Sequence, residues 1–185
     1  MKKNIFFLIL IFGAIPAFGQ NAYAKIITNQ NDTINVTIKL NSLWTPDIKS
    51  FQEKLVTVEN DGTKKEYLPA DIKSYRVKYY DKVIEYESID GKFFGELMYS
   101  NRLKLLKFIK LGYTNINFYI IKKPNNGKTL YMEAMGLSRL ISKKTILREI
   151  TDCQPTINKV ETNELKINGE KGVIELVKDY EENCF

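Results

Sequence analysis

Residues 23–40 read YAKIITNQNDTINVTIKL, and this stretch decides the fold class. From Thr33 to Leu40 every second side chain is apolar, which is the pattern of a strand that buries one face. Residues 23–28 supply a second apolar run, and the Asn29-Gln30-Asn31-Asp32 segment between the two runs is typical of a turn. The stretch therefore predicts a hairpin of two antiparallel strands.

The same alternation of short runs and turn residues continues along the chain. A second hairpin is expected to join residues 54–59 to residues 63–68 through Asn60-Asp61-Gly62, a sequence suited to positive φ. Residues 41–50, with Trp44 and Pro46, are expected to form a loop. Further strands are expected at residues 75–80, 83–88, 92–99, 115–122 and 129–135. About nine or ten short strands at this spacing predict an antiparallel β-sandwich or an open barrel.

Residues 103–111 fit two structures. Lys104, Lys107 and Lys110 recur at every third position among apolar residues, so this segment fits either a half-buried strand or an amphipathic helix with a lysine stripe. We favour the strand because Gly112 and a run rich in Tyr and Ile follow it. A helix would instead favour binding to a membrane surface.

After Gly136 the pattern changes to that of helices. Ser142 is a suitable N-cap for a helix whose apolar face runs from Ile146 through Ile150 to Cys153, and Asn168 is suitable for a last helix that reaches Cys184. The chain therefore predicts an α+β fold that is mostly β, with a helical tail from about residue 142.

The two cysteines are best interpreted as a Cys153–Cys184 disulfide, because an isolated pair in an oxidising compartment usually forms one. Redox or metal chemistry would need a CxxC spacing or histidine partners, and the chain has neither. Closing a loop of this length stabilises a fold by roughly 3 to 4 kcal/mol in the chain-entropy model.

The first nineteen residues have the pattern of a secretory signal peptide. Lys2 and Lys3 precede an apolar run from Ile5 to Ile15, and Ala17-Phe18-Gly19 forms a small-x-small cleavage site before Gln20. The run is shorter than a membrane span and no cysteine follows it, so we expect a cleaved signal at 1–19 and a single exported domain at 20–185, periplasmic or extracellular, with no transmembrane segment.

The charge of the chain is unevenly distributed. Without Lys2 and Lys3, the 28 basic side chains become 26 against 22 acidic ones, a net charge of +4. Residues 151–185 hold eight acidic and four basic side chains, so residues 20–150 carry +8. We favour an ordinary lysine-rich surface of a soluble protein, and the alternative is a body that binds anionic envelope polymers. A nucleic-acid partner is not expected, because the chain has no zinc-finger or RNP signature.

Most enzyme classes are excluded because the chain has no histidine, no P-loop, no GxGxxG fingerprint and no GxSxG elbow. No catalytic, cofactor or metal residue is predicted. Carboxylate chemistry remains as an alternative, because a glycan hydrolase needs only a pair of Asp or Glu side chains. Glu85 and Glu87 lie on one face of an expected strand, about 7 Å apart by strand rise. A ligand-binding surface is the stronger hypothesis, with Trp44 as its exposed anchor and Tyr79, Tyr80 and Tyr86 nearby.

Four segments of the chain form a combination of motifs, which are Pro69-x-Asp71-Ile72-x-x-Tyr75, residues 106–119, residues 147–153 and Tyr180-x-x-x-Cys184. This combination resembles a loosely defined group of short secreted Bacteroidota proteins. It implies an envelope location and a terminal cysteine pair, and it implies no substrate. Asp32-Thr33-Ile34 is also similar to the site at which such bacteria O-glycosylate exported proteins, with Thr33 as the acceptor.

The sequence thus predicts a non-enzymatic envelope protein that engages a protein or a polysaccharide.

Overall fold

The computed structural model describes residues 21–39, 48–79, 81–113, 115–125, 127–135 and 140–185. The predicted signal sequence and the candidate surface residues Trp44 and Tyr80 lie outside these residues.

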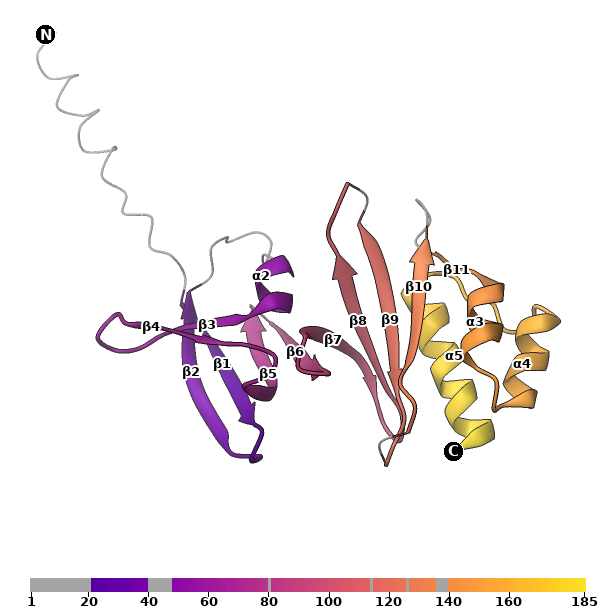
Figure 1. Cartoon of the computed structure of the whole chain (residues 1–185), viewed down its shortest axis with the longest axis horizontal. Coiled ribbons are helices and arrows are strands. Elements are labelled where there is room, and N and C mark those ends of the chain that lie inside the picture. The colour runs from indigo at the N-terminus through magenta and orange to yellow at the C-terminus, as the bar shows by residue number, and fades with distance from the viewer. Residues whose placement is uncertain (1–20, 40–47, 80, 114, 126, 136–139) are drawn as a thin grey trace, which may run out of the picture.

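The strands of the described residues form one antiparallel sheet of eleven strands, in the order β11-β10-β9-β8-β7-β6-β5-β1-β2-β3-β4 (Figure 1). They are β1 (Asn21–Thr28), β2 (Thr33–Lys39), β3 (Leu55–Val58), β4 (Lys64–Tyr67), β5 (Ile72–Tyr79), β6 (Lys82–Ile89), β7 (Phe93–Ser100), β8 (Lys104–Lys110), β9 (Ile116–Lys122), β10 (Leu130–Met135) and β11 (Leu140–Ile141). The mostly β, antiparallel fold is confirmed, and its strands make a single open sheet. Helices cover the face on which a second sheet would pack in a sandwich.

The predicted hairpins form where the turn residues allow them. Asn31 has a φ of 69° between β1 and β2, and Gly62 has a φ of 85° between β3 and β4. Residues at these positions must adopt the left-handed region of backbone conformation, which Asn and Gly tolerate best. After β4 the chain returns to the free side of β1, where β5 pairs with it, and β5 to β11 then follow as a meander.

Residues 103–111 contain a strand, which decides the question that the lysine spacing left open. In β8, Leu105 belongs to the core under the C-terminal helices, whereas Leu106 belongs to a cluster on the opposite face. Both faces of β8 are therefore covered, which explains why apolar residues occur on both sides of this strand.

The helices are α2 (Ile48–Glu53), α3 (Lys143–Glu149), α4 (Gln154–Glu161) and α5 (Gly169–Cys184). Ser142 caps α3 by accepting a hydrogen bond from the Thr145 N–H, and Asn168 stands at the N-cap of α5 without a side-chain bond. The predicted continuous helix through Cys153 is wrong, because α3 ends at Glu149 and Cys153 is the N-cap of α4. Pro155 lies in the first turn of α4 and has no N–H to continue a helix from before it. Helix α2 occupies part of the region expected to be a loop.

Two cores lie side by side on one face of the sheet. The N-terminal core contains Tyr75 and Phe94 and is covered by Phe51 of α2. The C-terminal core gathers side chains of β8 to β11 against α3 to α5, with Leu176 of α5 fully buried. Phe94 of the N-terminal core shares a face of β7 with Glu96, whose register partner Lys107 shares a face of β8 with Leu105 of the C-terminal core. Figure 1 shows α3, α4 and α5 grouped beside β10 and β11, with α2 beside the other half of the sheet.

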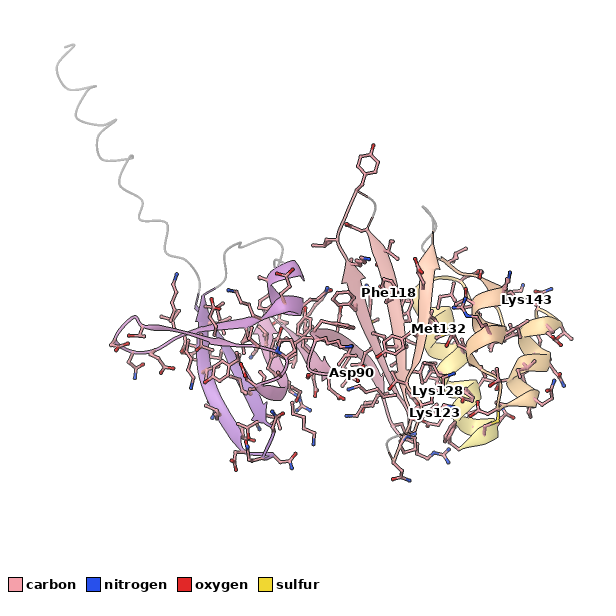
Figure 2. The ribbon with its side chains drawn as sticks, viewed as in Figure 1. Asp90, Phe118, Lys123, Lys128, Met132 and Lys143 are labelled. Atoms are coloured by element: carbon pink, nitrogen blue, oxygen red, sulfur yellow. A yellow bond between two sulfur atoms is a disulfide. The ribbon has the colours of Figure 1, made fainter. Side chains whose placement is uncertain are left out.

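A third cluster lies on the opposite face, where Ile89, Leu106 and Ile120 are fully buried. Figure 2 marks Phe118 of β9, which packs against this cluster, and Met132 of β10, which lies in the C-terminal core. The middle of the sheet is therefore covered on both faces.

The predicted Cys153–Cys184 disulfide is present and joins the start of α4 to the end of α5. Beside it, Lys123 (Figure 2) donates a hydrogen bond to Asp152 at 2.6 Å, and its ammonium lies 5.3 Å from the ring centroid of Tyr180. The disulfide and this group together fix α5 against the end of β9.

Candidate functional site

Glu85 and Glu87, the two carboxylates of the alternative hydrolase hypothesis, are each bound by cations. Glu85 accepts a hydrogen bond from the Arg76 guanidinium at 2.7 Å, and Glu87 accepts from Lys104 at 2.6 Å and from Lys122 at 2.8 Å. Burial alone would raise the pKa of Glu87, but the two ammonium groups outweigh it and hold this pKa below its usual range. A glycosidase acid needs a raised pKa so that it carries a proton at neutral pH. Glu87 therefore serves as an ion-pair centre and is unsuited to the general-acid role.

The predicted aromatic surface is wrong for Tyr86. This side chain is only 4% exposed, and its ring stacks on Tyr75 with centroids 5.0 Å apart and on Phe51 at 5.9 Å. Tyr86 and Tyr75 are register partners on β6 and β5, so alternation places both under α2. Tyr79 is the last residue of β5, and Trp44 and Tyr80 lie outside the described residues.

Among the strand side chains that the structure describes, the most exposed aromatic one is Tyr23 of β1, which is 76% exposed. It lines a shallow hollow of about 440 Å³ on the face opposite the helices, together with side chains of β2, β5 and β6. We call this surface the Tyr23 patch. Its side-chain members are Tyr23, Lys25, Asn35, Arg76, Lys78 and Val83.

The Tyr23 patch has an excess of positive charge. Lys25 and Arg76 are register partners on β1 and β5, a placement that is unfavourable for two like charges. Arg76 is neutralised by Glu85, but Lys25 and Lys78 form no ion pair with any carboxylate of the described residues. An anionic ligand lying across β1 and β5 would therefore meet two unpaired ammonium groups.

The patch combines cations with apolar contact area. Val83, the second residue of β6, is 64% exposed and borders the hollow together with the Tyr23 ring. Aromatic rings with a wet edge are common anchors of binding surfaces. The patch is flat and open, and the side chains that line it offer cations, an amide, an aromatic ring and an aliphatic group to a ligand.

Sequence reasoning missed the patch because its members come from distant segments. The alternation of Tyr23 and Lys25 with Ala24, and of Arg76 and Lys78 with Val77, does mark both sets as facing away from the core. No local signal, however, indicates that β5 pairs with β1, since the two strands are separated by β2, β3 and β4.

Thr33, the predicted O-glycosylation acceptor, is exposed and begins β2. Its modification stays a prediction.

Comparisons with family models, curated proteins and solved structures found no match. Within the described part of the chain, none of the helices is long and apolar enough to cross a membrane.

Proposed function

We propose that this chain is an exported, non-enzymatic interaction module of a bacterial envelope, and that its Tyr23 patch binds an acidic polysaccharide. The observation that carries the proposal is the 76% exposed Tyr23 ring beside the unpaired ammonium groups of Lys25 and Lys78. Export is supported by the signal-like pattern of residues 1–19, and a disulfide is compatible with an oxidising compartment.

A polysaccharide fits the patch better than a small molecule does. The patch is a shallow surface on the open face of a sheet, so it would leave most of a small ligand in water. A polymer gains affinity by lying along several strands, with a sugar ring against Tyr23 and carboxylates near the lysines. An acidic protein segment has similar charge, but only a polysaccharide offers an apolar ring face beside a carboxylate in every repeat.

The test is binding to polygalacturonate, an acidic polysaccharide, with neutral dextran as the comparison. We expect saturable binding to polygalacturonate only, weakened by added salt. Tyr23→Ala should weaken it by about five- to tenfold, the effect of removing one aromatic anchor. Tyr113→Ala is the matched control, because Tyr113 is fully exposed but lies between β8 and β9, away from the patch.

Equal loss in both tyrosine variants would contradict the proposal, as would equal binding to dextran. Binding to acidic proteins but to no polysaccharide would assign the patch to a protein partner instead.

The competing proposal, a carboxylate-based glycan hydrolase, predicts turnover that a Glu85→Gln/Glu87→Gln variant loses. Our proposal predicts no release of reducing ends by the unsubstituted protein and retained polymer binding in that variant, in which Lys25 and Lys78 are unchanged.

Export has its own test. Expressed in a bacterial host with its first nineteen residues, the protein should be recovered from the periplasm or medium with Gln20 as its first residue by mass spectrometry. Recovery of the uncleaved chain from the cytoplasm would contradict export.

A further inference from the structure

A second hollow adjoins the Tyr23 patch. It has a volume of about 420 Å³ and lies between β2 and the β3–β4 hairpin. Tyr23 and Asn35 line both hollows, so the two hollows are neighbours on either side of these side chains. We call the second one the hairpin hollow, and its members include Tyr23, Asn35, Thr37, Glu59, Asn60 and Lys65.

The hairpin hollow lies where β2 and β3 separate. The ladder between these strands has a single register pair, Ile38 with Thr57, and Figure 1 shows β3 and β4 running at a steep angle to β2. Thr37 of β2 is the register partner of Tyr23, so both side chains lie on the same face of the sheet. A polymer that passes over Tyr23 from the Tyr23 patch therefore reaches the hairpin hollow.

The two hollows differ in charge. The described residues that line the Tyr23 patch include three cations and no acid. Those that line the hairpin hollow include one cation, Lys65, and one acid, Glu59. A hydrogen bond with Tyr67 and the charge of Glu59 both raise the pKa of Lys65, so this ammonium already has a negative neighbour. A carboxylate that entered the hairpin hollow would meet the charge of Glu59 as well as that of Lys65.

The hairpin hollow also offers uncharged polar groups. The side chains of Asn35, Thr37 and Asn60 form no hydrogen bond within the part of the chain that the structure describes. Asn35 and Asn60 are exposed and Thr37 is half-buried, so their amides and hydroxyl are open to a ligand. Amides and hydroxyls both donate and accept hydrogen bonds, which suits the hydroxyl and acetamido groups of a neutral sugar.

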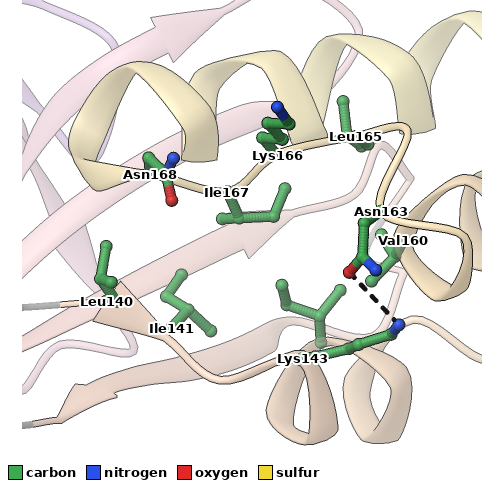
Figure 3. A pocket seen from close by; sticks show the side chains of 10 residues that line it. Leu140, Ile141, Lys143, Val160, Asn163, Leu165, Lys166, Ile167 and Asn168 are labelled. Atoms are coloured by element: carbon green, nitrogen blue, oxygen red, sulfur yellow. Dashed lines mark hydrogen bonds between the residues drawn. The ribbon is translucent and has the colours of Figure 1, made fainter.

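The hollow at the other end of the sheet offers less to a ligand. It lies between β11, α3 and the connection from α4 to α5 (Figure 3), and its members Ile141, Ile146 and Val160 are at most 5% exposed. These side chains already pack in the C-terminal core. Tyr23 is 76% exposed, so a ligand can still cover its ring.

We propose that the polysaccharide bound by this chain alternates acidic and neutral sugars. An acidic sugar lies over the Tyr23 patch, with its carboxylate near Lys25 and Lys78, and the neighbouring neutral sugar lies in the hairpin hollow. The Tyr23 ring contacts both sugars, because it lines both hollows. A polymer with a carboxylate on every sugar would place one of them beside Glu59, which is unfavourable. This inference rests on the proposed binding at the Tyr23 patch and adds the repeat of the ligand.

The test compares two hexasaccharides in calorimetric titrations of the exported, oxidised protein. One is a hyaluronan fragment, in which glucuronate alternates with N-acetylglucosamine, and the other is hexagalacturonate, which has a carboxylate on every sugar. We expect the hyaluronan fragment to bind at least about twofold more tightly, although it carries half of the charge. Glu59→Gln should strengthen the binding of hexagalacturonate by about two- to fivefold, the effect of one exposed charge pair, and leave the hyaluronan fragment unchanged.

The matched control is Glu164→Gln, which removes an exposed carboxylate between α4 and α5, outside both hollows, and should change neither affinity. The inference is overturned if hexagalacturonate binds as tightly as the hyaluronan fragment, or if Glu59→Gln changes both affinities equally or neither. In those cases, weaker binding of both oligosaccharides by Tyr23→Ala would still support the Tyr23 patch. A lack of saturable binding to either oligosaccharide would overturn both proposals.

Discussion

Glu181 of α5 is the buried charge that we expect to contribute most to the attachment of the tail. It is 3% exposed, and its carboxylate accepts hydrogen bonds from the Leu103 N–H at 2.7 Å, from the Asn101 amide at 2.6 Å and from the Tyr99 hydroxyl at 3.1 Å. Arg102 lies 3.9 Å away. One carboxylate thus accepts hydrogen bonds from a backbone N–H and from two side chains at the turn between β7 and β8.

Replacing Glu181 by Ala removes all of these acceptors at once. The buried Leu103 N–H is left without a partner, which costs about 1 to 3 kcal/mol. Tyr99 and Asn101 can turn towards water, so each of their lost bonds costs about 0.5 to 1.5 kcal/mol. We therefore expect a loss of about 4 kcal/mol in the free energy of unfolding, the middle of the range that these three lost hydrogen bonds give together. The exposed neighbour Glu182, changed to Gln, is the control and should alter stability by less than about 0.5 kcal/mol.

The pH dependence distinguishes a buried carboxylate from a merely well-packed one. Burial would raise the pKa of Glu181, but the hydrogen bonds from Leu103, Tyr99 and Asn101 and the charge of Arg102 outweigh it and lower this pKa. A lowered folded-state pKa contributes stability above the unfolded value of about 4.3, and that stability is lost as the pH falls through the folded value. Measured by urea unfolding, the advantage of the unsubstituted protein over Glu181→Gln should be constant near neutral pH and shrink below about pH 4.5. A constant difference down to about pH 3, or Ala and Gln variants as stable as the Glu182→Gln control, would refute the reasoning.

Three further predictions concern the fold. A Cβ at Gly95 would lie 2.6 Å from Cδ1 of the fully buried Ile89, so Gly95→Ala should lower the free energy of unfolding by about 1 to 3 kcal/mol in urea titrations. Reduction of Cys153–Cys184, which are 31 residues apart, should cost roughly 3 to 4 kcal/mol, and unchanged stability in a Cys153→Ser/Cys184→Ser variant would contradict this. The Gln52 amide accepts a hydrogen bond from the Ile109 N–H at 3.0 Å and donates one to the Ile109 carbonyl at 2.8 Å. Gln52→Leu should therefore lower the free energy of unfolding by about 1 to 3 kcal/mol and speed hydrogen exchange of the Ile109 amide. Slow exchange at Ile109 in the variant would count against that role.

Local patterns predicted most of the strands and the disulfide. Strands β1 to β4 follow from period-two runs and from turn residues that accept positive φ, as at Asn31 and Gly62. The Cys153–Cys184 bond followed from the chain having a single pair. These features depend on neighbouring residues, which a sequence shows directly.

Non-local packing explains what the sequence did not show. Tyr86 looked like surface because an alternating strand does not reveal which of its faces is covered, and the covering residue Phe51 comes from the unexpected helix α2. The break before Cys153 could have been found from Pro155, which is tolerated only in the first turn of a helix. The Tyr23 patch required the β1–β5 pairing, and long-range strand pairing leaves no local pattern.

The most direct test of the central claim is an amide chemical-shift map of the isotope-labelled protein during titration with oligogalacturonate. Our account predicts that the shifted amides fall in β1, β2, β5 and β6 around Tyr23, Lys25, Arg76 and Lys78, and that Tyr23→Ala removes most of the shifts. Shifts confined to other surfaces, or an unchanged map in the Tyr23→Ala variant, would contradict it.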